Sequence, residues 1–139
     1  MTPTGRWTAA LALALALAAC HTFRTGPVPG TDADALVRIG VGETVTLDED
    51  RFAISFARVL NDSRCPSGAQ CVHEGDAAVG LVLQERGEAT RTVELHTAVD
   101  PRRVSHEGYV VELVALEPVP VAGQAESKDY VVTLRVRRG

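Results

Sequence analysis

The sequence predicts an all-β fold, a small antiparallel β-sandwich or partly open barrel of about 6–8 strands that follows a disordered tether. Apolar and polar residues alternate along several segments, as expected for strands with one buried face. Beyond the N-terminal segment, no stretch carries apolar residues at helical spacing. The connections are too short for most parallel crossovers, which favours antiparallel pairing.

The first 19 residues have the layout of an export signal. Arg6 and the N-terminal amine carry its positive charge, and residues 8–19 are only Ala and Leu after Thr8. As a helix this segment would span about 18 Å, which is too short for a bilayer core of about 30 Å. We therefore expect residues 1–19 to be a removable signal peptide.

The end of this leader resembles the lipobox of bacterial lipoproteins. Leu17-Ala18-Ala19-Cys20 has the Leu, the small residue and the Ala or Gly that precede the modified Cys in that family. The resemblance implies a diacylglycerol thioether on Cys20, cleavage before it and acylation of the new amine. Two or three acyl chains would anchor the protein stably. The alternative is an ordinary secretory signal in which Cys20 is incidental.

The residue after Cys20 bears on location. In lipoproteins of two-membrane bacteria, Asp at this position tends to retain the protein in the inner membrane, and here it is His21. The resemblance therefore implies a cell-envelope protein that faces the periplasm or exterior. It implies the outer membrane where the cell has one.

A tether and a single domain are expected after the leader. Residues 20–35 combine the lipidated Cys with a Gly- and Pro-containing stretch that lacks apolar periodicity, and residues 36–139 form one β domain. Without Arg6, thirteen basic and eighteen acidic residues remain, a net charge of −5. This balance argues against nucleic-acid binding and against attachment to anionic headgroups by charge.

The alternation places most strands along the chain. A turn at residues 40–42 precedes the first of them, and residues 85–88 form a hairpin turn. The expected strands are residues 44–47, 52–57 continuing towards 60, 77–84, 90–95, 109–116 and 130–137.

The last two of these strands carry positional signals. Residues 109–116 are apolar on both faces except at Glu112, which predicts a central strand, and Pro118 and Pro120 end it. The final strand ends at Arg137-Arg138, where basic residues would protect an exposed sheet edge.

Two cysteines remain once Cys20 is assigned to lipid. Cys65 and Cys71 form an even pair in an oxidising compartment, with a turn-forming Pro66-Ser67-Gly68 between them. We predict a disulfide that contributes about 2.4 kcal/mol through loop-closure entropy.

The loop around this pair has two interpretations. It is either a structural staple between two strands or a constrained surface that presents residues to a partner. In the second case, Arg64, Gln70, His73 and Glu74 are the candidate binding residues.

The run at 62–66 (DSRCP), with Cys71 and Gly75 after it, is similar to a motif in small bacterial secreted proteins and lipoproteins of unknown function. The similarity extends over the strand pattern of the domain. In that group Trp commonly stands at the position of His73 and Ala at that of Glu74, so this sequence departs there. No activity comes with the resemblance.

Metal and catalytic chemistry find little support in the sequence. His73 lies near Glu74 and Asp76, but no HxH or HxxxH spacing occurs and no metal site is expected. Ser105-His106 is adjacent only in sequence, since neighbouring residues on an extended chain point to opposite faces, and we expect a polar turn there. The chain also lacks a G-x-S-x-G elbow and a P-loop.

The sequence therefore predicts a lipid-anchored envelope protein that acts as a non-catalytic binding or structural module. Its expected partners are the membrane, through the lipid on Cys20, and an envelope protein. No cofactor beyond that covalent lipid is expected. One alternative is a loop that presents Arg64 or Gln70 to inhibit an extracytoplasmic protease, and a metal-binding module is another.

Overall fold

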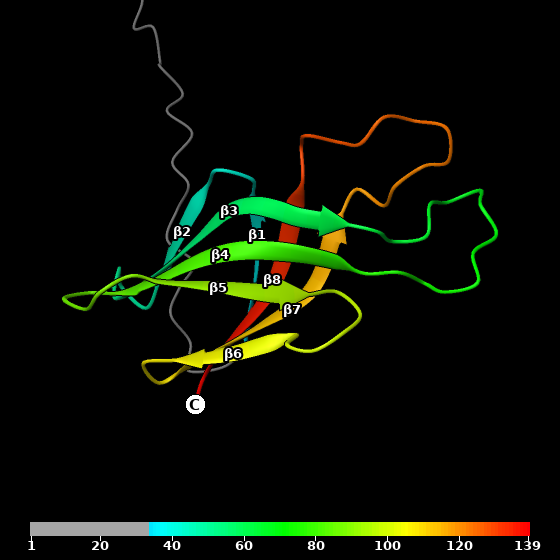
Figure 1. Ribbon diagram of the computed structural model, residues 1–139. Helices are drawn as coiled ribbons and strands as arrows, with labels where there is room; N and C mark the ends of the chain where they lie inside the picture. The colour runs from blue at the N-terminus through cyan, green and yellow to red at the C-terminus, as the bar shows by residue number, and fades with distance from the viewer. Residues whose placement is uncertain (1–33) are drawn as a thin grey trace, which may run out of the picture.

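The computed structural model describes residues 34–139, which contain eight β-strands and no helix (Figure 1). The predicted leader, Cys20 and most of the predicted tether lie outside the described residues. The strands are β1 (Ala35–Gly40), β2 (Thr44–Leu47), β3 (Phe52–Asp62), β4 (Ala77–Glu85), β5 (Arg91–His96), β6 (Arg103–His106), β7 (Tyr109–Glu117) and β8 (Val131–Arg138).

The strands form two four-stranded sheets, in the orders β1-β8-β7-β6 and β2-β3-β4-β5. Every pairing between neighbouring strands is antiparallel, as predicted. Of the two predicted architectures, the structure therefore has the β-sandwich.

The core lies between the two sheets and follows from the alternation. In β8, Val132, Leu134 and Val136 are buried while the residues between them are only partly covered. Phe52 of β3 stacks on Tyr109 of β7 with ring centroids 4.2 Å apart, which joins the sheets near one end. Each fully buried apolar side chain contributes roughly 1.5–3 kcal/mol relative to an exposed one.

The structure corrects two details of the prediction. β7 is central as expected, but β8 lies between β1 and β7, so Arg137 and Arg138 do not protect an exposed edge. Ser105 and His106 are the last residues of β6, and the turn is Glu107-Gly108, both with positive φ. The short β6 carries too few apolar residues to show alternation, which explains the error.

The sandwich has two distinguishable ends. At the hairpin end, Ala35 pairs with Val136 and the β6–β7 turn follows His106. At the loop end, two long connections lie side by side, residues 63–76 between β3 and β4 and residues 118–130 between β7 and β8 (Figure 1). The described residues contain no helix long and apolar enough to span a membrane.

Candidate functional site

The first loop begins as a continuation of the β3–β4 hairpin. The Ser63 N–H donates to the Asp76 carbonyl and the Cys65 N–H to the Glu74 carbonyl, each over 2.7 Å. Gly75 has a φ of 72°, and a Cβ there would lie 1.8 Å from the Ser63 carbonyl oxygen. Only glycine fits this close approach, so residue 75 fixes how the loop leaves the sheet.

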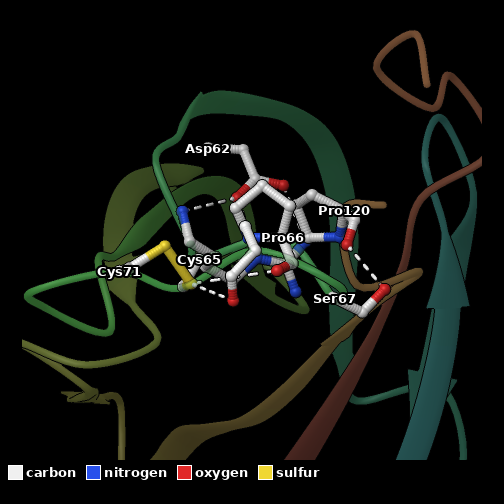
Figure 2. The surroundings of a disulfide bond; sticks show 8 residues. Asp62, Cys65, Pro66, Ser67, Cys71 and Pro120 are labelled. Atoms are coloured by element: carbon white, nitrogen blue, oxygen red, sulfur yellow. Dashed lines mark hydrogen bonds and ion pairs between the residues drawn. A yellow bond between two sulfur atoms is a disulfide. The ribbon is translucent and has the colours of Figure 1, made fainter. Parts of the chain in front are cut away.

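The tip of this loop is closed by the predicted disulfide. Cys65 and Cys71 are bonded, with their Cα atoms 5.9 Å apart (Figure 2). Between them the Ala69 N–H donates to the Pro66 carbonyl over 3.1 Å, which forms the turn. The chain around the tip is therefore held both covalently and by backbone hydrogen bonds.

The second loop is joined to the first through its backbone. The Ser67 N–H donates to the Pro120 carbonyl over 2.8 Å, and the Ala122 N–H donates to the Ser67 carbonyl over 3.1 Å. Ser67 and Val121 thus form a short parallel β-bridge, and Figure 2 shows the Ser67 side chain turned towards Pro120. Sequence analysis assigned no role to residues 118–130 beyond ending a strand.

Arg64 also joins the two loops, from the inside. Its Nε and Nη2 donate to the two carboxylate oxygens of Asp62 over 2.8 and 2.6 Å. Its Nη1 and Nη2 donate to the carbonyls of Leu116 and Pro118 over 2.5 and 2.8 Å. The Arg64 side chain is only 12% exposed, so it fixes the loops to β7 and is turned into the protein, away from a partner.

Asp62 and Tyr130 complete this polar group. The Tyr130 hydroxyl donates to Asp62 Oδ2 over 3.0 Å. Burial acts to raise the pKa of the Asp62 carboxyl, but the hydrogen bonds and charge of Arg64 outweigh it and lower that pKa below its usual value. Burial, together with the hydrogen bond to Asp62, raises the pKa of Tyr130 to about 12. We call Asp62, Arg64 and Tyr130 the loop-end triad.

The other predicted binding residues are available on the surface. Gln70, His73 and Glu74 are all exposed. Sequence analysis missed Val72, which lies beside Cys71 and is 92% exposed. A valine directly after a cysteine in an otherwise polar loop was the sequence signal that could have singled it out.

The second loop adds apolar surface beside the first. Val119 and Val121 are 54% and 42% exposed, and Val121 forms the bridge to Ser67. We call the exposed side chains of these two joined loops the loop platform. It consists of Gln70, Val72, His73, Glu74, Val119 and Val121.

The histidines of the domain do not gather into a metal site. His96 Nδ1 lies 2.6 Å from Asp76 Oδ2 at the base of the first loop, while His106 is buried in β6 near Phe52. His73 is exposed on the loop platform. Among residues 34–139, no group of three or more His, Cys, Asp or Glu side chains is placed to hold a metal ion.

Asp76 instead organises the chain around it. Its Oδ1 accepts hydrogen bonds from the Ala98 N–H over 2.8 Å and from the Thr97 hydroxyl over 3.2 Å. Burial acts to raise the pKa of the Asp76 carboxyl, but the hydrogen bonds from His96, Ala98 and Thr97 outweigh it and lower that pKa. These contacts tie the base of the first loop to the chain after β5.

Comparison with known proteins yields no match to a protein-family model, a curated protein or a solved structure. The geometry itself must therefore carry the functional argument. It provides two loops joined to each other and to the sheets, with exposed polar and apolar side chains on a fixed backbone.

Proposed function

We propose that this protein is a lipid-anchored lipoprotein of the bacterial cell envelope. In this proposal the sandwich domain binds another envelope protein through the loop platform and performs no catalysis. Anchoring rests on the lipobox Leu17-Ala18-Ala19-Cys20. Binding rests on the platform itself.

One observation carries the binding proposal, namely that both loops are ordered by internal contacts. The disulfide closes the first loop, the Ser67–Val121 bridge joins it to the second, and Arg64 fixes both to β7. A surface already held in one conformation loses little conformational entropy when a partner binds. Val72 on this fixed backbone offers an apolar contact that water now covers.

The position of the platform fits an anchored protein. The described chain enters β1 at Ala35, at the hairpin end, whereas the platform lies at the loop end. A domain tethered through Cys20 can therefore turn its platform away from the membrane.

The alternatives have less support. A protease inhibitor would offer a side chain to the enzyme, but Arg64 is engaged with Asp62 and two carbonyls, which leaves Gln70. A metal-binding module would need ligands that converge, and His73 lies apart from His96.

Site-specific crosslinking in intact cells tests the binding proposal. A photo-crosslinking residue in place of Val72 is expected to capture a defined envelope protein. The same residue in place of Leu36, which is 62% exposed on β1 at the hairpin end, serves as the matched control. Capture of the same proteins from both positions, or of none from position 72, would contradict the proposal.

Labelling with palmitate tests the anchor separately. Label is expected in the wild-type protein and not in the Cys20→Ala variant. Equal labelling of the two proteins, or no labelling of either, would contradict the lipid anchor. The crosslinking experiment would still test the loop platform independently.

A further inference from the structure

An open depression of about 460 Å³ lies at the hairpin end, away from the loop platform. Residues of β6, β7 and β8 form it, and none of them is acidic. The lining residues are Arg103, Val104, Ser105, Val110, Arg137 and Arg138. Arg103, Ser105 and Arg137 extend from the outer face of this sheet, whereas the Arg138 guanidinium lies over the Tyr109 ring on the inner face. Two guanidinium groups and one hydroxyl beside an open hollow suit a ligand with negative charge.

The three arginines differ in how far their charge is already balanced. Arg137 lies 3.0 Å from Glu112 and 3.2 Å from Asp34, and Arg138 lies 2.8 Å from Asp48. Arg103 is exposed and has no hydrogen bond or ion pair with any other residue in 34–139. Arg103 lies opposite Glu112 of β7, whose carboxylate pairs with Arg135 and Arg137 instead. The depression therefore contains one guanidinium that forms no ion pair within residues 34–139.

The depression lies beside the point at which the chain from Cys20 enters the domain. Ala35 pairs with Val136, the residue directly before Arg137, so the chain that leads back to Cys20 enters beside the depression. Fourteen residues separate Cys20 from Ala35, and at about 3.4 Å each they reach up to roughly 48 Å. A lipid on Cys20 thus leaves this end of the domain free to touch the headgroups.

We propose that this depression binds the phosphate of a membrane phospholipid whose headgroup carries a net negative charge. Binding there would hold the hairpin end against the membrane and direct the loop platform away from it. The proposal rests on the lipid anchor put forward under the proposed function. The overall charge of −5 opposes attachment to an anionic surface, but the attraction at the depression is local and acts within about 10 Å at ordinary ionic strength.

Vesicle sedimentation of the mature Cys20→Ala chain, residues 20–139, tests the site without help from an acyl chain or from the apolar leader. We expect binding to vesicles of phosphatidylglycerol and phosphatidylcholine in equal parts, and much weaker binding to phosphatidylcholine alone. Arg103→Gln is expected to weaken binding roughly fivefold, the usual effect of one basic residue at an anionic surface. Arg58→Gln is the matched control, since Arg58 is exposed on β3, outside the depression.

The other outcomes would overturn the proposal. Equal loss in the Arg103 and Arg58 variants would indicate unspecific charge attraction. Binding of inorganic phosphate, followed by calorimetry, with no vesicle binding would assign the depression to a free anion. Urea denaturation serves as the folding control. Unchanged midpoints for both variants show that a loss of vesicle binding is not caused by unfolding. If palmitate fails to label Cys20 while Arg103-dependent vesicle binding persists, the anchor fails and the headgroup site stands.

Discussion

The two ends of the sandwich carry the same polar group in different surroundings. At the loop end, Tyr130 donates to Asp62, which pairs with Arg64. At the hairpin end, Tyr109 donates to Asp48 over 2.5 Å, and Asp48 pairs with Arg138 over 2.8 Å. We call Asp48, Tyr109 and Arg138 the hairpin-end triad.

Burial separates the two triads. The side chains of Arg64 and Asp62 are 12% and 1% exposed, whereas those of Arg138 and Asp48 are 46% and 34% exposed. Arg64 also donates to two backbone carbonyls. An exposed ion pair is screened by water and contributes little, while a buried one is costly to break because its remaining charge has no partner. The comparison teaches that the same three residue types are expected to contribute more to stability where their charged groups are shielded from water.

Removal of Arg64 is expected to have the largest effect. Arg64→Ala leaves the Asp62 carboxylate buried without its partner and frees two carbonyls, so we expect a loss of about 3 kcal/mol in the free energy of unfolding. Urea denaturation measures this loss. If the free energy of unfolding falls by no more than it does for an ordinary surface substitution, the triad does not behave as a buried group.

Loss of the disulfide is expected to rank next. Replacing both Cys65 and Cys71 by Ser removes loop-closure entropy worth about 2.4 kcal/mol. Hydrogen exchange is expected to accelerate at residues 63–76 and not in the hairpin-end triad. Acceleration at both ends would mean that the loop is not an independent unit.

The pH dependence of stability tests the loop-end triad. Asp62 has a lowered pKa, so its stabilisation is present above the ordinary value of 3.8 and is lost as the pH falls below it. Tyr130 has a pKa raised from 10.0 to about 12, so its stabilisation is present below pH 10.0 and is lost as the pH rises to about 12. Thermal melts of Tyr130→Phe are expected to lose this alkaline dependence, and a wild-type profile there would contradict it.

The smallest effect is expected at the hairpin end. Arg138→Gln removes an exposed charge from Asp48 and from the face of Tyr109, and water replaces much of what is lost. The urea midpoint is expected to move only slightly, by a small fraction of the Arg64→Ala shift. Equal shifts of the urea midpoint in Arg138→Gln and Arg64→Ala would contradict the expected difference between the two triads.

Sequence patterns were sufficient for the parts of the fold that have one buried face. Alternation in β3 and β8 follows from burial on one side, and the pairing of Cys65 with Cys71 follows from the cysteine count. β6 escaped detection because its four residues have only Val104 as an aliphatic side chain. The central place of β8 was missed because β1, which covers its other side, was not recognised as a strand.

The loop platform was only half predictable. The first loop was recognisable from its cysteines, but its contact with Pro120 and Ala122 uses backbone atoms, which leave no mark in the sequence. Arg64 was misjudged for a related reason. Two of its partners are carbonyls more than fifty residues away, so nothing near it in the sequence shows that it is turned inward.

The pairing of Ala35 with Val136 places the first and last strands of the domain side by side at the hairpin end. The domain could therefore be circularly permuted. A permuted chain, opened at the exposed Arg86–Gly87 turn and closed by a short linker from β8 to β1, would keep every strand pair. In such a chain the point of attachment could be moved around the domain while the loop platform stayed as it is.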